Sequence, residues 1–292
     1  MYHEFRRPTI LVIGATGAQG GGVARHLLAD GRWTVRALTR NPQSSAARTL
    51  RDAGVEIAVG DLDVPSSLRR AMVMCHGVHG IASVQPHRGQ AHRGHALPHG
   101  LAIVDAAAAA NVKHLVLQFG ADTPLAPQQR WARLCGVPTT FVRAAFHYEH
   151  LLHGALPRPA VDEQARGAGG TGDAAPLAAV SAEDVGGVVA AIFARRREHV
   201  GRPVAVVCDV RPAHESADVL ARTLGRPVTR GLLSFPPHAA DTPSSAWPAA
   251  AADLEASRRL FPRLRTFEQW ARVHARELAR GVAALEAETR AA

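Results

Sequence analysis

A glycine-rich stretch near the beginning of the sequence constrains the fold more than any other feature. Residues Thr9 to Ile13 are apolar or β-branched, which predicts a buried strand. Gly14, Gly17 and Gly20 follow at a spacing of three, and residues 23–28 then carry apolar side chains at helical spacing. A strand, a glycine turn and a helix in this order are the context of a dinucleotide-binding fingerprint. The alternative is a glycine turn in an ordinary βα unit.

The three glycines serve different physical purposes in such a fingerprint. Gly14 permits a sharp turn, Gly17 leaves space where the backbone approaches a pyrophosphate, and Gly20 lets the helix pack close to the strand. The helix N-terminus then offers free N–H groups and a partial positive charge to the phosphates. The stretch therefore predicts a dinucleotide site.

Composition and charge limit the other classes of partner. The chain has 292 residues and a formal net charge of +9, with Lys113 as its one lysine. The arginines are spread along the chain and are not interleaved with aromatic residues, so a nucleic-acid surface is not expected. No apolar run reaches the length of roughly 20 residues that spans a membrane, and the run after Arg7 feeds into the glycine turn, so no signal peptide is expected.

The cysteines indicate the compartment. Cys75, Cys135 and Cys208 are scattered, odd in number and form no Cys-x-x-Cys pair. Reduced thiols in a cytoplasm are the simplest interpretation.

A basic residue marks the end of the second predicted strand, 33–39. There the chain reads Arg40-Asn41-Pro42, where NAD-specific folds commonly place an acidic residue for the ribose hydroxyls. Arg40, helped by Arg36, would meet a 2′-phosphate through paired charged hydrogen bonds, which favours NADP(H) over NAD. The alternative is a solvated arginine at a strand end.

Further cofactor contacts are expected after the third and fourth strands, 55–59 and 77–82. Asp61 and Leu62 follow the third strand, where the adenine edge and face would lie. Ala82 and Ser83 lie at the carboxyl end of the fourth strand and should line the crevice, because ligands of open α/β sheets bind there. Asp63 offers a different role, as the N-cap of the next helix.

A histidine-rich stretch follows the fourth strand. His87, His92, His95 and His99 lie among glycines and a proline without a cysteine or carboxylate pattern, so no metal site is expected. We expect a mobile polar loop over the mouth of the site, in which one histidine could act as an acid or a base.

The remaining pattern predicts an α/β fold, a Rossmann-like doubly wound parallel sheet with a small C-terminal α/β lobe. Helices at 44–53, 97–110 and 126–135 alternate with strands at 114–118 and 139–143. We expect residues 1–150 to form the first domain, joined by the helix 181–195 and the strand 204–208. Residues 151–292 would form the smaller lobe.

Within the predicted lobe the signals are uneven. Residues 146–152 suggest a short helix, 155–179 irregular strands and loops, and the proline-rich 231–250 a loop. A helix at 213–224 and a capping box at Thr266 and Gln269 are clearer, the latter with Phe267, Trp270, Val273 and Leu278 as buried positions.

Five segments together resemble the NmrA-like family of atypical short-chain dehydrogenase/reductase folds. They are Gly14-Ala-Thr-Gly-Ala-Gln-Gly20-Gly, Thr39-Arg-Asn-Pro42, Gly60-Asp61, Phe141-Val-Arg-Ala-Ala-Phe-His-Tyr-Glu-His-Leu-Leu152 and Val180-Ser-Ala-Glu-Asp-Val-Gly186. The resemblance covers roughly residues 8 to 230. Phe119-Gly120 is also similar to the isoflavone-reductase-like branch.

The resemblance implies a set of cofactor contacts. NADP(H) would lie in the crevice, with the glycine turn on the pyrophosphate and Arg40 on the 2′-phosphate. The implied cofactor-binding residues are Gly14, Thr16, Gly17, Ala18, Gln19, Gly20, Arg40, Asp61, Leu62, Ala82, Ser83 and Phe119.

The sequence departs from the superfamily in its proton-transfer residues. Standard members use Tyr-x-x-x-Lys, in which tyrosine exchanges the proton and lysine lowers its pKa. Here tyrosine occurs only at positions 2 and 148 and lysine only at 113, so no such pair exists. Tyr148 and His147, just past the sixth strand, are the candidate proton donors, and packing is the alternative role of both.

Two functions from different classes follow. The first is an NADPH-dependent oxidoreductase that acts on a small molecule with an unusual proton donor. The second is a regulator that binds NADP(H) without turnover and passes the redox state to a protein partner. A non-redox enzyme that reuses the fold is a weaker third hypothesis. The sequence is compatible with a homodimer but does not predict one.

Overall fold

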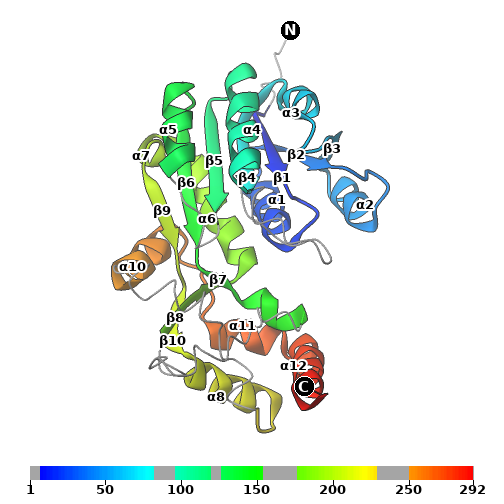
Figure 1. The fold of residues 1–292 in the computed structure, drawn as a ribbon, viewed down its shortest axis with the longest axis vertical. Coiled ribbons are helices and arrows are strands. Elements are labelled where there is room, and N and C mark those ends of the chain that lie inside the picture. Colours follow the sequence, from blue (N-terminus) through cyan, green and yellow to red (C-terminus); the bar gives the residue numbers. More distant parts are fainter. Residues whose placement is uncertain (1–6, 82–95, 120–125, 154–175, 229–249, 292) are drawn as a thin grey trace. The chain divides into compact units, whose positions relative to one another are not determined.

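The computed structural model describes residues 7–81, 96–119, 126–153, 176–228 and 250–291 (Figure 1). The chain forms two compact units. The first contains Met1–Ala144 and Glu183–Ala205, and the second contains Ala145–Ala182 and Val206–Ala292.

A seven-stranded sheet forms the centre of the first unit, in the order β3-β2-β1-β4-β5-β6-β9 (Figure 1). The strands from β3 to β6 pair in parallel, and the order reverses direction beside β1. This confirms the predicted doubly wound α/β fold. The strands are β1 (Thr9–Ile13), β2 (Thr34–Thr39), β3 (Glu56–Val59), β4 (Cys75–Ile81), β5 (His114–Phe119), β6 (Thr139–Ala144) and β9 (Pro203–Val206).

Helices cover both faces of this sheet. Helices α3, α4 and α5 pack side by side, as Figure 1 shows, and α6 packs against α1 through glycine backbones. The helices are α1 (Ala18–Asp30), α2 (Ser45–Asp52), α3 (Pro65–Met72), α4 (Ala96–Ala109), α5 (Ala126–Leu134), α6 (Ala182–Ala194) and α7 (Arg196–His199).

The core follows from burial of the sheet on both faces. Every residue of β1 and β5 is buried, which is why these strands have nearly continuous apolar sequences. Leu11 and Ile13 belong to the cluster that includes Ile103 of α4 and Phe141 of β6. Because successive side chains of a strand point to opposite faces, Ile10 and Val12 lie on the other side.

Two histidines lie inside this sheet. His79 of β4 and His114 of β5 are 0% and 1% exposed. Nε2 of His114 lies 2.9 Å from Oγ1 of Thr140, and its ring meets Phe193 of α6 edge-on. Burial is the main cause that lowers the pKa of His79 to about 4 and the pKa of His114 to about 3. Both rings are therefore neutral in the folded protein at pH 7.

The second unit contains a small mixed sheet in the order β10-β8-β7. Strand β8 is antiparallel to β10 and parallel to β7. The elements of the second unit are β7 (Phe146–His147), the 3₁₀ helix η1 (Tyr148–His153), β8 (Pro176–Val180), β10 (Asp209–Pro212), α8 (Ala213–Leu224), α10 (Ala250–Leu260), α11 (Phe267–Val273) and α12 (Ala275–Ala291). The predicted helix at 146–152 is thus a two-residue strand followed by a 3₁₀ helix. Of the segment 155–179, which was predicted to hold irregular strands and loops, only the part in β8 is described. The predicted loop over 231–249 lies outside the described residues.

An aromatic cluster forms the core of the second unit. Tyr148 lies 5.1 Å from Phe267 and 5.2 Å from Trp270 between ring centroids, and Leu278 is fully buried beside them. The predicted capping box is confirmed, since Thr266 and Gln269 exchange both hydrogen bonds. The predicted burial of Val273 is wrong, because this residue is 66% exposed. Six residues after Phe267, it falls outside the stripe of α11 that faces the core.

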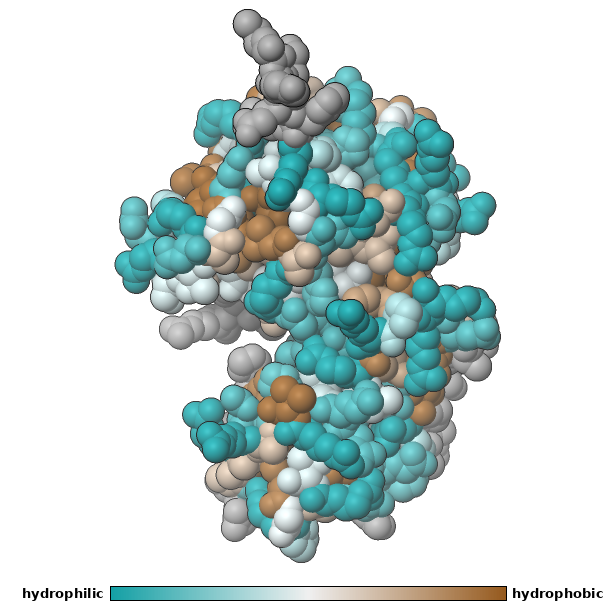
Figure 2. All heavy atoms as spheres, turned by 180° about the vertical axis from the view of Figure 1, so that it is seen from behind, coloured by the Kyte–Doolittle hydropathy of each residue, from teal (hydrophilic) through white to brown (hydrophobic). Residues whose placement is uncertain are grey.

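The face drawn in Figure 2 is mostly hydrophilic, with small groups of apolar residues. The large exposed apolar side chains are Val59, Val64, Val73, Met74, Trp131, Leu134 and Val273. Within the described ranges, no helix has both the length and the apolar character that a membrane span requires.

The contact between α6 and α1 predicts that alanine at Gly186 destabilises the protein, although helix propensity alone predicts that it stabilises it. A Cβ added at Gly186 would lie 2.3 Å from the backbone carbon of Gly22. Helix propensity alone would make alanine at this position stabilising by about 0.5–1 kcal/mol. We expect Gly186→Ala to lower the free energy of unfolding by roughly 1–3 kcal/mol instead, because backbone cannot yield as a side chain does. Urea unfolding measures this, and a stabilised variant would contradict the close contact.

The buried histidines predict an acid-sensitive fold. Their folded pKa values lie below the unfolded value of about 6.5, so the unfolded chain binds more protons at acidic pH. The contribution of these neutral histidines to the free energy of unfolding is present above pH 6.5 and is lost as the pH falls toward 4. Each histidine should remove about 2 kcal/mol between pH 7 and pH 5. Urea unfolding of His114→Gln over this range should show a shallower pH dependence than the unchanged chain; an equal dependence would refute the assignment.

Candidate functional site

The glycine turn after β1 adopts the conformation that the sequence predicts. Gly14 has φ +76°, a left-handed conformation that favours glycine. The N–H of Gly17 donates to the carbonyl oxygen of Gly14 at 3.0 Å, and α1 begins at the next residue. The chain therefore reverses from the strand into the helix within four residues.

Two of the glycines are explained by different neighbours. A Cβ at Gly20 would lie 2.4 Å from the backbone of Gly14, so this position needs glycine for the helix to approach the strand. A Cβ at Gly17 would meet only the oxygen of Gly14, at an ordinary 3.5 Å, and its φ of −101° suits any residue. Nothing in the described protein excludes a side chain at Gly17, which fits a position kept small for a ligand.

The electrostatics of this turn fit an anion. The first turn of α1 has no acidic side chain, and its N-cap Gly17 supplies no capping group. The N–H groups of Ala18 and Gln19 find no acceptor among the described residues, and they carry the partial positive charge of the helix N-terminus. The structure thus brings together Gly14, Thr16, Gly17, Ala18, Gln19 and Gly20, of which Gly14, Thr16, Gly17 and Ala18 are exposed.

A buried hydrogen-bond chain, which the sequence analysis missed, reaches this turn. Nε2 of His79 lies 3.1 Å from Oε1 of Gln118 on β5, and Nε2 of Gln118 donates to Oε1 of Gln19 at 2.7 Å. Gln118 is 1% exposed. Polar residues within apolar strands were the available signal, but their pairing depends on the β4–β5 register and the packing of α1.

The two arginines of β2 have different environments. Arg40 is exposed and makes no side-chain hydrogen bond or ion pair with any described residue. Arg36 donates to Glu56 at 3.0 Å and to the carbonyl oxygens of Ala71 and Val73. Arg36 is therefore held by the protein itself, which argues against its expected help at a 2′-phosphate, whereas Arg40 is available.

The turn after β3 is organised by Ser67 of α3. Its Oγ accepts from the N–H of Asp61 at 2.9 Å and donates to the carbonyl oxygens of Asp61 and Val64. Leu62 is half-buried against the core. The expected N-cap role of Asp63 is wrong, because Val64 is the N-cap of α3 and Asp63 pairs with His99 at 2.8 Å.

The other predicted crevice residues divide into two groups. Phe119 is 1% exposed and stacks on Phe141 within the core, which supports a packing role for its side chain. Ala82 and Ser83 lie outside the described residues, as do His87, His92 and His95. In the part of the chain that is described, no group of three metal-ligating side chains converges.

The candidate proton donors both belong to the second unit. Tyr148 is 3% exposed within the aromatic cluster, and His147 is 8% exposed. Burial, followed by the nearby His150, lowers the pKa of His147 to about 3. At pH 7 roughly one ring in 10,000 would then carry the proton that an acid must donate. These environments favour packing over proton donation.

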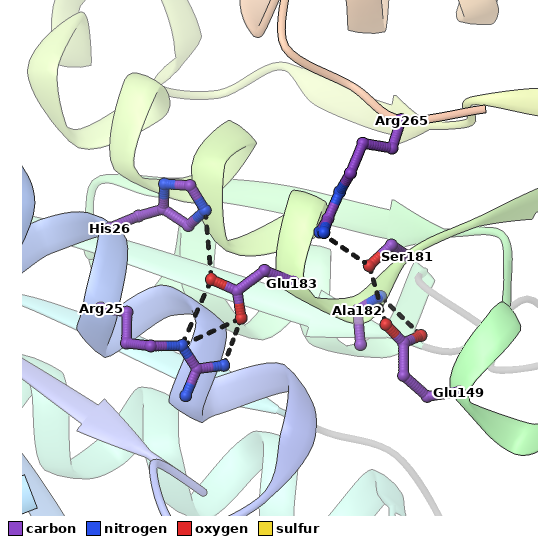
Figure 3. Close-up of polar contacts among 7 residues, drawn as sticks. All are labelled: Arg25, His26, Glu149, Ser181, Ala182, Glu183 and Arg265. Carbon is purple, nitrogen blue, oxygen red and sulfur yellow. Dashed lines mark hydrogen bonds and ion pairs between the residues drawn. The ribbon is translucent and has the colours of Figure 1, made fainter. Parts of the chain in front are cut away.

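Two polar clusters mark the start of α6 (Figure 3). In one, Oε1 of Glu149 accepts from Oγ of Ser181 at 2.7 Å, and Oε2 accepts from the N–H of Ala182 at 2.8 Å. A carboxylate at a helix N-terminus is stabilised by the helix dipole. In the other, Glu183 pairs with Arg25 of α1 and with His26 at 3.4 Å. The first turn of α6 holds two acidic residues, Glu183 and Asp184, and Glu149 is a contact that the sequence did not predict.

Curated relatives match part of the chain. The NmrA-like family domain-containing oxidoreductase FrzB of Cladobotryum sp is 41% identical over 112 residues, which are 38% of this chain and 33% of FrzB. The NAD(P)H azoreductase of Xenophilus azovorans is 32% identical over 153 residues, 49% of this chain and 50% of that enzyme. The chain thus spans half or less of these two relatives.

Solved structures resemble nearly the whole chain in fold. NmrA, a negative transcriptional regulator, superposes with a TM-score of 0.70 at 20% identity over 91% of this chain and 95% of that chain. The triphenylmethane reductase of Citrobacter sp., solved with NADP(H), gives 0.64 at 23% identity over 89% and 98%. NmrA has been solved with NADP and with NAD.

The family assignment follows from the sequence match and the fold together. Residues 6–122 match the NmrA-like family, and this range carries β1 to β5 and the glycine turn. The fold of the described residues is the Rossmann-like fold of its structural neighbours. Through residues 6–122, the chain is similar to the NmrA-like family.

Proposed function

We propose that the chain binds NADP(H) and is an NADPH-dependent oxidoreductase that acts on a small molecule. One observation supports this most: the backbone amides of Ala18 and Gln19 and the guanidinium of Arg40, which have no partner among the described residues, follow two adjacent strands. Because β1 and β2 pair in parallel, their carboxyl ends meet at the same edge of the sheet. A dinucleotide there would place its pyrophosphate on the turn and its 2′-phosphate beside Arg40.

The charge distribution favours NADP(H) over NAD(H). An acidic side chain at the end of β2 would bind the ribose hydroxyls of NAD, but this strand ends at Thr39 and is followed by Arg40. A guanidinium forms paired, charge-assisted hydrogen bonds with phosphate. Because Arg40 has no described partner, these bonds would not require an existing ion pair to break.

The missing proton-transfer pair limits the chemistry. When bound, NADPH supplies hydride, and the protein supplies orientation and, where needed, a proton. His147 is neutral and Tyr148 is packed against Phe267 and Trp270, so neither suits an acid. Substrates that need no protein acid are therefore favoured, such as a cation that hydride neutralises, or a quinone whose reduced anion takes its proton from water.

The names of the relatives support the redox assignment. FrzB is an oxidoreductase, the Xenophilus azovorans relative is an azoreductase and the Citrobacter structure is a triphenylmethane reductase. The name of the Citrobacter enzyme agrees with a triarylmethane cation as the hydride acceptor argued above, whereas an azo bond lies outside that substrate class. A homodimer in the cytoplasm with reduced cysteines remains part of this proposal.

A second function has a specific observation in its favour. NmrA, a negative transcriptional regulator, shares the fold at a TM-score of 0.70, and this chain has no Tyr-x-x-x-Lys pair. A regulator needs the dinucleotide site without a proton donor, and would pass the redox state to a protein partner. Turnover separates the two functions.

The first prediction concerns turnover. Purified chain with NADPH should oxidise the cofactor when supplied with quinones or cationic triarylmethane dyes, and much more slowly with ketones, whose alkoxide product needs an acid. Loss of NADPH absorbance measures the rate. Tight NADPH binding with no rate above background on the whole panel would exclude the oxidoreductase and leave the regulator.

The second prediction concerns cofactor choice. Arg40→Ala should weaken NADPH binding by roughly tenfold or more, because a charge-assisted hydrogen bond to phosphate contributes about 1.5–3 kcal/mol. NADH binding should stay unchanged, since NADH lacks the 2′-phosphate. Fluorescence titration measures both dissociation constants.

The matched control is Arg133→Ala. Arg133 is an exposed arginine of α5, so this variant has the same net charge. It should leave both affinities unchanged. An equal effect of Arg40→Ala on NADPH and NADH would refute the 2′-phosphate assignment.

A further inference from the structure

The buried chain His79–Gln118–Gln19 has a direction. Oε1 of Gln118 faces Nε2 of His79 at 3.1 Å, so the imidazole donates and the amide accepts. The amide nitrogen of Gln118 then donates to Oε1 of Gln19 at 2.7 Å. Each amide has one donating and one accepting end, so fixing the first contact fixes the second.

Burial makes this direction persistent. His79 is 0% and Gln118 is 1% exposed, so water does not compete for their polar groups. Breaking either bond would leave a buried donor or acceptor without a partner, which is costly.

The consequence appears at the glycine turn. With its Oε1 committed to Gln118, Gln19 presents its Nε2 group, which has no acceptor among the described residues. Gln19 is the second residue of α1 and is only half-buried. The side chain therefore adds a donor at the helix end where backbone amides already favour an anion.

We propose that the Gln19 side-chain amide donates to the pyrophosphate of the bound dinucleotide, and that Gln118 and His79 are positioning residues that hold it in this orientation. The proposal rests on the NADP(H) binding argued above. The opposite direction of the chain would turn Oε1 of Gln19 toward the phosphates and repel them. Binding of an anion and the buried chain thus favour the same orientation.

The experiment is a double-mutant cycle in the full chain. Gln19→Met removes the amide at a half-exposed position, and Gln118→Met removes the buried bond that orients it. NADPH and 2′-phospho-ADP-ribose, which shares the pyrophosphate but lacks nicotinamide, are the two probes. Titration gives dissociation constants, and thermal unfolding reports whether each variant folds.

We expect the effects of the two substitutions on affinity to be coupled, and to be the same for both probes. Gln19→Met should weaken each probe by about tenfold, and Gln118→Met by several-fold. Adding Gln118→Met to Gln19→Met should produce no further loss, because the positioned group is already gone. Equal losses from Gln118→Met in both backgrounds would show a merely structural role and overturn the proposal.

Other outcomes are also decisive. A change below twofold for Gln19→Met, or a loss confined to NADPH, would overturn the pyrophosphate assignment. If Gln118→Met does not fold, Gln19→Glu replaces it: the carboxylate still accepts from Gln118 but presents oxygen to the phosphates, and should bind less tightly than Gln19→Met. Tighter binding than Gln19→Met would overturn the proposal. If the unsubstituted chain binds neither probe, the proposed NADP(H) binding itself is refuted, which is a separate result.

Discussion

The contact between the backbone of α1 and the turn that precedes it controls the rest of the first unit. No side chain fits at Gly20, where a Cβ would lie 2.4 Å from Gly14, nor at Gly186 of α6, where it would lie 2.3 Å from Gly22. Helix α1 is therefore in backbone contact with the strand turn on one side and with α6 on the other. Its glycines weaken the isolated helix, and the packing they allow offsets that cost. This position aims the first-turn amides at the carboxyl edge of the sheet.

The electrostatics of that edge depend on which arginine side chains are already paired with other groups of the protein. Arg36 and Arg40 lie four residues apart in and after β2, yet Arg36 is occupied by Glu56 and two carbonyl oxygens, while Arg40 has no partner among the described residues. An arginine already bonded within the protein gains little from a phosphate, because those bonds must first break. A preference for a 2′-phosphate would thus depend on one guanidinium and not on the local density of basic residues.

The sequence predicted what depends on local pattern. Continuous apolar runs identify strands buried on both faces, and the glycine spacing identifies the turn, so β1, α1 and the parallel order were predictable. Tertiary contacts were not. The partners of Arg36 lie 20 to 39 residues further along the chain, and the bond between Gln19 and Gln118 spans 99 positions. Val273 was misplaced because a short helix turns that residue away from the core even though it is apolar.

Burial also decides which chemistry the chain can support. A histidine in a dry environment loses its proton, so His147 cannot serve as an acid at neutral pH even though histidine is the usual choice. The tyrosine beside it gains aromatic contacts with Phe267 and Trp270, and these contacts hold the core of the second unit. Reduction of a ketone without an acid must form a free alkoxide, which is costly in a water-excluded site. Hydride transfer to a cation or a quinone would avoid that intermediate, so the absence of a Tyr-x-x-x-Lys pair would restrict the substrate of the proposed oxidoreductase and does not by itself exclude turnover.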